Sequence, residues 1–179
     1  MDMLEPSSDP LRVFFAIWPT EPAARALHDW AGALATTTGG KVMPAQTIHL
    51  TLAFLGSVDS ARVPAAIDAA RQVSGRPTSL PIEQCRYWPR SRIVWVGPRE
   101  TPVEVSELAR SLAQALRRAG FALEKRAFAA HVTLLRKARG TRALPSPPAV
   151  SWPVDEFTLV RSVTASEGSR YEILARFAL

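Results

Sequence analysis

The sequence predicts an α+β fold of two pseudo-symmetric lobes, each with an antiparallel-rich sheet and outer helices, around a central groove. First, a His-x-Thr-Leu stretch at His49–Leu52 recurs at His131–Leu134. Second, each copy follows an apolar, β-branched run that ends at a proline, Arg12–Pro19 and Arg92–Pro98. Third, in both copies a segment with apolar residues at helical spacing lies between the apolar run and the histidine. The repeat is longer than the roughly 20–50 residues of a solenoid unit, which indicates two similar lobes.

The first copy contains a helix with clear start and stop signals. Thr20 is a candidate N-cap, and Pro22 is tolerated in a first helical turn. Apolar residues at helical spacing predict a helix over residues 23–34, namely Ala24, Leu27 and Ala31. Gly39-Gly40 predicts its end. A further helix is expected over Ser60–Val73, with an inward face of Ala66, Ile67 and Ala70.

The second copy repeats the helix with a longer apolar face. Thr101-Pro102 opens it, Arg117 and Arg118 suit its C-terminus, and Gly120 closes it. Its predicted buried face consists of Val105, Leu108, Leu112, Ala115 and Leu116. Four other segments read as extended: Leu80–Tyr87, Phe121–Lys125, Phe157–Thr164 and Tyr171–Phe177. The proline-rich segment Ala138–Pro153 reads as a long loop, either a lid over the groove or a surface excursion.

The repeated stretch carries the residue types needed for acid–base chemistry. Side chains alternate between the faces of a strand, so His49 shares a face with Thr51, and His131 shares one with Thr133. An imidazole titrates near neutrality, and a hydroxyl can donate to an anionic oxygen. One such pair is more often an ordinary strand feature. Two facing pairs would supply a proton acceptor, a proton donor and two anion clamps, which phosphodiester cleavage without a metal requires.

Composition agrees with a basic, soluble enzyme. The 179 residues carry a formal net charge of +6, which favours polyanionic ligands, and 47% are hydrophobic. A single cysteine, with no His-x-His spacing, predicts neither a disulfide nor a metal site. We expect no cofactor, no membrane span and, given an acidic N-terminus without a signal-like basic region, a cytoplasmic location. We expect one monomeric domain over residues 1–179, with 1–10 a disordered extension.

The motifs resemble a known group of enzymes, and the resemblance covers most of the chain. Residues Val42–Gly56, the later His131–Arg136 and the opening Arg12–Ile17 together resemble the 2H phosphoesterase superfamily. Within it, the similarity is greatest to the bacterial and archaeal RNA 2′,3′-cyclic phosphodiesterases, also known as 2′-5′ RNA ligases. The resemblance implies a bilobal, metal-free fold that hydrolyses a 2′,3′-cyclic phosphate end of RNA to a 2′-phosphate, with reversible 2′-5′ joining.

The resemblance also implies roles for individual residues. His131 would be the general base that activates water, and His49 the general acid that protonates the leaving 3′ oxygen. Thr51 and Thr133 would donate hydrogen bonds to the non-bridging phosphate oxygens, and Arg136 is the leading cation for the same oxygens. Strict alternation places Arg136 on the opposite face of the strand from Thr133. This assignment therefore needs a bend in the strand or the end of the strand at Arg136. The same alternation places Phe54 in the core.

Two alternatives share these residues or this fold. One is a phosphodiesterase of a small cyclic nucleotide or of a cyclic phosphate of ADP-ribose, which would differ only in the groove. The other is a non-catalytic RNA-binding module, which would have no need of two proton carriers. The aromatic residue that stacks on a base stays open, because tryptophans in predicted strands are more often core: Trp18, Trp88, Trp95 and Trp152.

Overall fold

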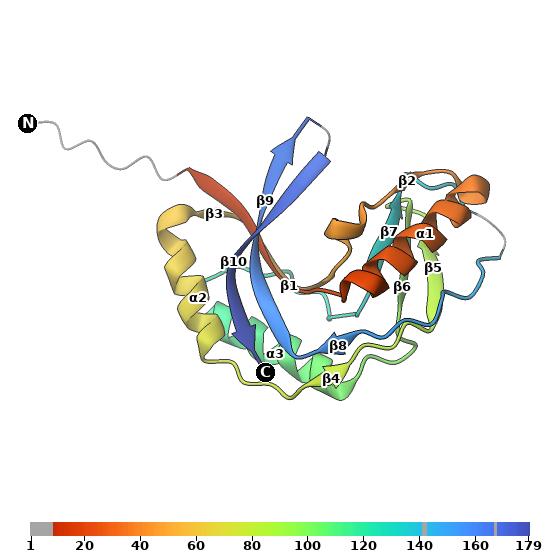
Figure 1. Ribbon diagram of the computed structural model, residues 1–179. Helices are drawn as coiled ribbons and strands as arrows, with labels where there is room; N and C mark the ends of the chain where they lie inside the picture. The colour runs from red at the N-terminus through yellow and green to blue at the C-terminus, as the bar shows by residue number, and fades with distance from the viewer. Residues whose placement is uncertain (1–8, 141–142, 167) are drawn as a thin grey trace, which may run out of the picture.

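The computed structural model describes residues 9–140, 143–166 and 168–179 and contains two four-stranded sheets in which every pairing is antiparallel (Figure 1). The first has the order β10-β9-β1-β3, formed by Gly168–Ala178, Glu156–Ala165, Pro10–Ile17 and Leu50–Asp59. The second has the order β2-β7-β6-β5, formed by Lys41–Val42, Val132–Arg136, Ile93–Gly97 and Gln84–Trp88. Two short strands, β4 (Thr78–Ser79) and β8 (Pro153–Val154), pair with each other below them.

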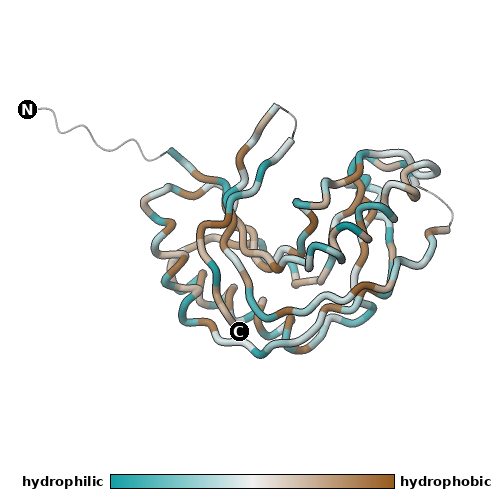
Figure 2. The backbone as a smooth tube through the Cα atoms, viewed as in Figure 1, coloured by the Kyte–Doolittle hydropathy of each residue, from teal (hydrophilic) through white to brown (hydrophobic). Residues whose placement is uncertain are grey.

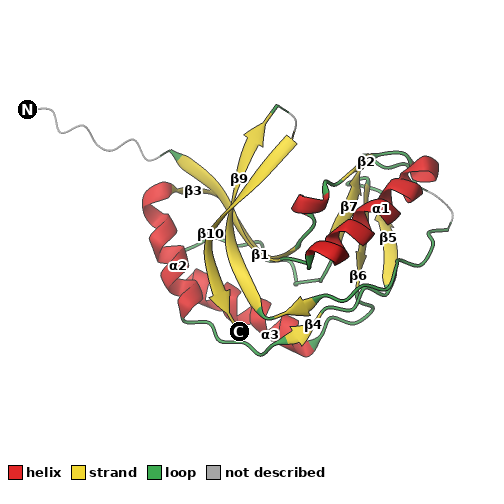
Figure 3. Cartoon of the chain, in the orientation of Figure 1, coloured by secondary structure: helices red, strands yellow, loops and turns green. Residues whose placement is uncertain are grey.

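The helices are exchanged between the two halves. Helix α1 (Glu21–Thr38) follows β1 of the first sheet but packs against β2 and β7 of the second. Helix α3 (Val103–Arg118) follows β6 of the second sheet but packs against β3 and α2 (Val63–Arg71) of the first. Figure 3 shows α1 beside the right-hand strands, while α2 lies at the left. Each histidine therefore lies where the chain, after the helix, re-enters the sheet that it left: His49 directly before β3 and His131 directly before β7. Strands β3 and β7 contact each other between the two halves.

The helix signals in the sequence are confirmed, except that the start of α3 has Pro102 at its N-cap position and no side-chain cap. The Thr20 hydroxyl accepts a hydrogen bond from the Ala23 amide at 3.3 Å, which caps α1. Gly39 ends that helix with a φ of 63°, a left-handed conformation that glycine adopts without strain. The predicted face of α3 is buried, and Gly120 follows its end with a φ of 82°. Between β3 and α2, a 3₁₀ turn (η2, Ser60–Arg62) replaces the first turn of the expected helix.

Two extended segments differ from the prediction. Residues 80–83 of the expected strand Leu80–Tyr87 lie outside any strand, and β5 begins at Gln84. The prediction of a strand over Phe121–Lys125 is wrong. Phe121 is buried and Leu123 packs on the core, so the segment has strand-like alternation. It has no strand partner among the described residues, and its alternation reflects two side chains anchoring a loop.

The hydrophobic core extends through both halves. Apolar stretches, brown in Figure 2, occur along the chain in both. Trp152 is fully buried, as expected, and anchors the proline-rich segment. Residues 139–140 and 143–152 contain no helix or strand. Residues 141–142 lie outside the described part of the chain. The expected N-terminal extension also falls mainly outside them, at residues 1–8, while Pro10 already pairs with Asp59 in the first sheet. No helix in the described residues is long and apolar enough to cross a membrane.

Candidate active site

Both His-x-Thr stretches line one pocket between the two sheets. The pocket has a volume of about 290 Å3. The segment that leads into β3 contributes Thr47, His49 and Thr51 to its lining. The segment that leads into and along β7 contributes His131, Thr133 and Arg136. The structure therefore brings together all five residues that the sequence singled out. We refer to this space as the histidine pocket.

The two imidazoles are held in the same way. The Nδ1 of His49 lies 2.7 Å from the carbonyl oxygen of Thr47, and the Nδ1 of His131 lies 2.9 Å from that of Ala129. A carbonyl oxygen can only accept, so each Nδ1 carries a proton and donates it. The Nε2 atom of each ring is left as the nitrogen that can exchange a proton with a ligand. The repeat thus extends to a backbone carbonyl two residues before each histidine.

Thr51 lies beside the reactive nitrogen of the first histidine. Its Oγ1 atom is 3.1 Å from the His49 Nε2 atom. When His49 is neutral, the hydroxyl donates to the ring; when His49 is protonated, the ring donates to the hydroxyl. Thr133 lines the same pocket from β7. Both hydroxyls can therefore reach an anion held between the rings.

A β-bulge in each histidine-bearing strand changes the faces that the sequence predicted. Thr133 pairs with Trp95 and Leu135 pairs with Val94, so Leu134 is an extra residue in β7. Leu52 is the extra residue at the same place in β3, between Thr51 and Ala53. A bulge puts two consecutive residues against one on the partner strand and resets the alternation. This is the bend that Arg136 requires, and Arg136 lines the histidine pocket.

The same bulge makes the prediction for Phe54 wrong. Phe54 occupies in β3 the position that Arg136 occupies in β7, and it is 38% exposed rather than buried in the core. The guanidinium carbon of Arg12 lies 4.7 Å from the centre of its ring, a cation–π contact. Phe54 therefore faces the groove, as Arg136 does on the other side.

Burial weakens the basicity of both imidazoles. Burial is the largest influence on His49 and lowers its pKa to about 4, against the opposing hydrogen bond to Thr47; Arg136 and His131 lower this pKa further. Burial also lowers the pKa of His131, against the hydrogen bond to Ala129, and the nearby Arg126 adds to that effect. Both rings are therefore neutral at pH 7 in the free protein.

Aromatic rings provide much of this burial. The ring centres of Phe14, Trp18 and Tyr171 lie 4.9, 5.3 and 5.4 Å from that of His49. Trp88 and Trp95 lie 4.7 and 6.2 Å from His131. Three of the tryptophans expected in the core, Trp18, Trp88 and Trp95, are thus only half-buried and contact the histidines.

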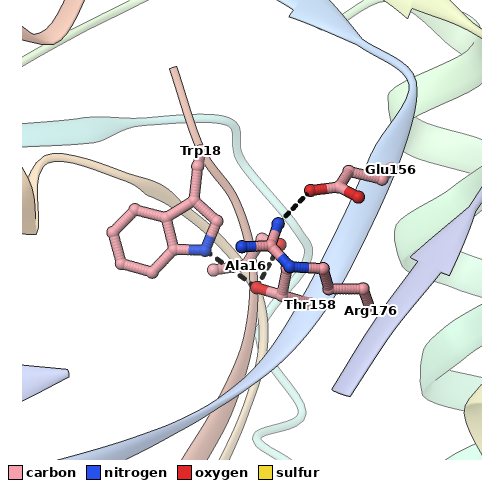
Figure 4. A network of polar contacts seen from close by, with 5 residues as sticks. All are labelled: Ala16, Trp18, Glu156, Thr158 and Arg176. Carbon is pink, nitrogen blue, oxygen red and sulfur yellow. Dashed lines mark hydrogen bonds and ion pairs between the residues drawn. The ribbon is translucent and has the colours of Figure 1, made fainter. Parts of the chain in front are cut away.

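Trp18 is fixed by a polar contact across the first sheet (Figure 4). Its indole Nε1 donates to the Thr158 hydroxyl at 2.8 Å, and that hydroxyl lies 3.4 Å from the Ala16 carbonyl oxygen, to which it donates. The network neighbours an ion pair between Glu156 and Arg176. Because Thr158 is fully buried, the Trp18 ring has a defined position against His49.

Two residues near the site escaped the sequence analysis. Arg126 lines the histidine pocket from the loop before His131. Tyr171, on β10, contacts the His49 ring. Neither lies in a His-x-Thr stretch, so only the fold brings them there. The remaining histidine, His28, bonds through Nδ1 to the Met43 carbonyl at 2.8 Å; Met43 lines the histidine pocket, but His28 does not. Within the described residues, no group of three or more His, Cys, Asp or Glu side chains is placed to hold a metal.

Comparisons with known proteins identify the family of the chain. The family model described as "LigT like Phosphoesterase" matches the chain twice, at residues 17–95 and 96–171, which reproduces the internal repeat. A protein of Escherichia coli strain K12 named RNA 2′,3′-cyclic phosphodiesterase is 37% identical over 175 residues, which cover 96% of this chain and 98% of that protein.

Solved structures show the same fold. The crystal structure of E. coli LigT complexed with 3′-AMP superimposes with a TM-score of 0.89 at 34% identity, covering 96% of this chain and 99% of that one. A structure from Thermus thermophilus gives a TM-score of 0.81 at 26% identity, covering 94% and 98%. The double family match and the full-length relative show that the chain belongs to the LigT-like phosphoesterase family.

Proposed function

We propose that this protein hydrolyses 2′,3′-cyclic phosphate ends of RNA to 2′-phosphates by acid–base catalysis between His49 and His131. The observation that carries the proposal is the repeated geometry: two imidazoles in one pocket, each with Nδ1 bound to a carbonyl and Nε2 available to a ligand. Two proton carriers are what an in-line displacement at phosphorus needs. The name of the E. coli relative and the 3′-AMP complex of E. coli LigT support a ribonucleotide as substrate.

Each residue of the pocket has a task in this proposal. The Nε2 atom of His131 accepts a proton from the attacking water, and the Nε2 atom of His49 gives one to the leaving O3′ as its bond to phosphorus breaks. Thr51 and Thr133 donate to the non-bridging oxygens, where charge changes in the transition state. Arg136 neutralises the phosphate, since guanidinium groups bind phosphate oxygens in pairs.

The substrate itself accounts for a protonated His49. In the free protein burial keeps this ring neutral, and the charge of Arg136 acts in the same direction. A bound phosphate anion cancels the field of Arg136 and adds a negative charge next to the ring. Both changes favour imidazolium and raise the pKa of His49. The acid therefore forms in the complex with substrate rather than in the empty site.

An RNA oligonucleotide with a 2′,3′-cyclic end tests the function directly. We expect hydrolysis in the presence of EDTA, with the phosphate left on the 2′ oxygen, because His49 protonates O3′ and no metal takes part. Product mapping with a phosphatase and an enzyme specific for 3′-phosphates distinguishes the two isomers. A 3′-phosphate product, or activity that EDTA abolishes and a divalent cation restores, contradicts the proposal.

The pH dependence should differ between the free enzyme and the complex. The plot of kcat/KM reports free-enzyme ionisations, and both histidine pKa values are lowered from 6.5. We therefore expect a bell whose maximum lies below pH 6.5, with apparent values that belong to the coupled pair. The bell for kcat should lie at higher pH, because bound phosphate favours imidazolium. Coincident bells, or a monotonic profile, would contradict the two-histidine mechanism.

We further propose that the protein acts as a cytoplasmic monomer and that its two lobes fold as a single domain. One chain supplies both histidines and both threonines, so the site needs no second copy. The exchanged helices α1 and α3 tie the halves together, since each packs on the sheet that it does not follow.

A further inference from the structure

Two residues beside the histidine pocket have an unusual backbone conformation. Among the described residues, Arg92 and Lys137 are the two that have a positive φ without being glycine, at 55° and 58°. Arg92 ends the turn of residues 89–92 between β5 and β6, and Lys137 directly follows Arg136 at the end of β7. In this left-handed conformation the Cβ atom crowds the following carbonyl oxygen, so the conformation persists only where the surrounding structure holds it.

Three hydrogen bonds join these two segments. The Arg92 Nη2 atom donates to the Lys137 carbonyl oxygen at 3.2 Å, and the Arg92 Nε atom donates to the Ala138 carbonyl oxygen at 3.3 Å. In return, the Ala138 amide donates to the Arg92 carbonyl oxygen at 3.0 Å. We call these bonds the Arg92 clamp. Because the clamp connects the β5–β6 turn to the residues after Arg136, it fixes the direction in which the chain leaves β7.

The end of α1 contacts the same residues. The Arg139 amide donates to the Thr38 carbonyl oxygen at 2.7 Å. A Cβ atom at Gly40 would lie 2.8 Å from the Arg136 carbonyl oxygen and 3.0 Å from the Ala138 Cα atom, so the two backbones touch without room for a side chain. Ala138 is fully buried. The backbone after Arg136 is therefore held both by the β5–β6 turn and by the end of α1.

The Arg136 side chain has no such anchor of its own. It is exposed and lines the histidine pocket. In the part of the chain that the structure describes, no acceptor forms a hydrogen bond or an ion pair with its guanidinium group. The backbone at the end of β7 therefore sets where this group can reach. A guanidinium that binds phosphate oxygens in pairs needs a defined position, because a bidentate contact depends on the direction of both N–H groups.

We infer that Arg92 is a positioning residue for Arg136: the Arg92 clamp holds the end of β7 so that the Arg136 guanidinium meets the phosphate between the two histidines. The task of Arg136 in this inference rests on the proposed function. Arg92 itself does not touch the substrate, since its neighbours Ser91 and Ile93 line the histidine pocket and Arg92 does not. It acts through the backbone.

The variant Arg92→Asn tests the clamp and keeps the turn, because asparagine tolerates the left-handed conformation and lacks the guanidinium group. We expect kcat/KM for a cyclic-ended RNA to fall on the order of tenfold. The affinity for inorganic phosphate, measured as a competitive inhibitor, should fall by a similar factor. Arg136→Met should cause at least the same losses. The double variant should lose no more than Arg136→Met alone, because Arg92 then has no guanidinium to position.

Arg62→Asn is the matched control. The Arg62 guanidinium also donates to two carbonyl oxygens, those of Ala119 and Gly120 at the end of α3, at 3.3 and 3.0 Å. Arg62 does not line the histidine pocket. The same substitution there removes a similar pair of hydrogen bonds, and both kcat/KM and phosphate affinity should stay close to parental.

The titration of His49 provides a readout that a general loss of stability would not reproduce. Arg136 is among the groups that lower the pKa of His49 in the free protein, but it is not among those that lower the pKa of His131. Displacement of the Arg136 guanidinium should therefore raise the pKa of His49 in Arg92→Asn, as its removal does in Arg136→Met, and leave that of His131 unchanged. An NMR titration of the histidine ring signals measures both values.

Three results would overturn the inference. A loss in the double variant that equals the product of the two single losses would mean that Arg92 acts independently of Arg136. An unchanged pKa of His49 in Arg92→Asn would mean that the Arg136 guanidinium has not moved. A loss in Arg62→Asn as large as that in Arg92→Asn would assign the effect to the fold in general. If the wild type does not hydrolyse cyclic ends, the proposed function fails, and phosphate affinity and the His49 titration still test the clamp.

Discussion

Substitution of His49 by alanine should lower hydrolysis of a 2′,3′-cyclic phosphate at least about a hundredfold but have much less effect on an aryl phosphodiester. A nitrophenolate leaves without being protonated, so bis(4-nitrophenyl) phosphate does not need the general acid. The general base is still required, because water must lose a proton with either substrate. His131→Ala should therefore slow both reactions at least about a hundredfold. The measurement is kcat/KM for both substrates with each variant.

His28→Ala is the matched control for this experiment. His28 is the one other histidine among the three of the chain; it does not line the histidine pocket, although it bonds to the carbonyl of Met43, which does. Its loss should leave both activities close to parental. If His131→Ala instead keeps the aryl activity and His49→Ala loses it, the acid and base roles are reversed. If neither variant loses activity, the histidine pocket is not the active site.

Removal of both hydroxyls by Thr51→Val and Thr133→Val should nearly silence the enzyme while the fold remains. Valine keeps the β-branched shape and removes the donor. Hydrogen bonds that stabilise developing charge are worth about 2.7–4 kcal/mol each in other enzymes. Each single variant should therefore lower kcat about a hundredfold or more, with a smaller change in KM, because the loss falls on the transition state.

Thr51→Ser and Thr133→Ser provide the control, since serine retains the hydroxyl. These variants should keep most of the activity, which separates loss of the donor from loss of packing. Melting temperatures of the valine variants should stay near that of the parent. A double valine variant that melts normally and still turns over at near-parental kcat would show that these hydroxyls are ordinary strand residues.

The sequence by itself determined the parts of this protein that depend on local chemistry and on repetition. The duplicated His-x-Thr stretches identified four of the residues that line the histidine pocket: His49, Thr51, His131 and Thr133. The Thr20 cap located the start of α1, and glycines located the ends of α1 and α3, because helix ends depend on nearby side chains and on backbone freedom. The start of α3 has no side-chain cap. Two similar copies at long spacing predicted two lobes, which follows from the repeat alone.

Local alternation was less reliable where a strand carries a bulge. It placed Arg136 and Phe54 on the wrong face, because Leu134 and Leu52 are extra residues against their partner strands. A signal was present in the sequence: Leu134-Leu135 and Leu52-Ala53 are consecutive apolar pairs that break a strict alternation. The pairing partner is needed to show that such a pair is a bulge, because a bulge is defined by the register of two strands.

Only the tertiary structure decided what surrounds the histidines and which sheet each helix covers. Helix α1 follows β1 of the first sheet in the sequence, yet it packs on the second sheet. The helix propensity of a segment does not determine which sheet that helix packs against. Likewise Tyr171 and Arg126 reach the site from segments without any His-x-Thr signal. The pKa of a histidine depends on burial and on charges brought from distant positions, so the lowered value of His49 could not be read from its neighbours in the chain. The local sequence therefore determines which side chains can carry protons, whereas long-range packing determines the pKa values of these side chains and the shape of the pockets beside them.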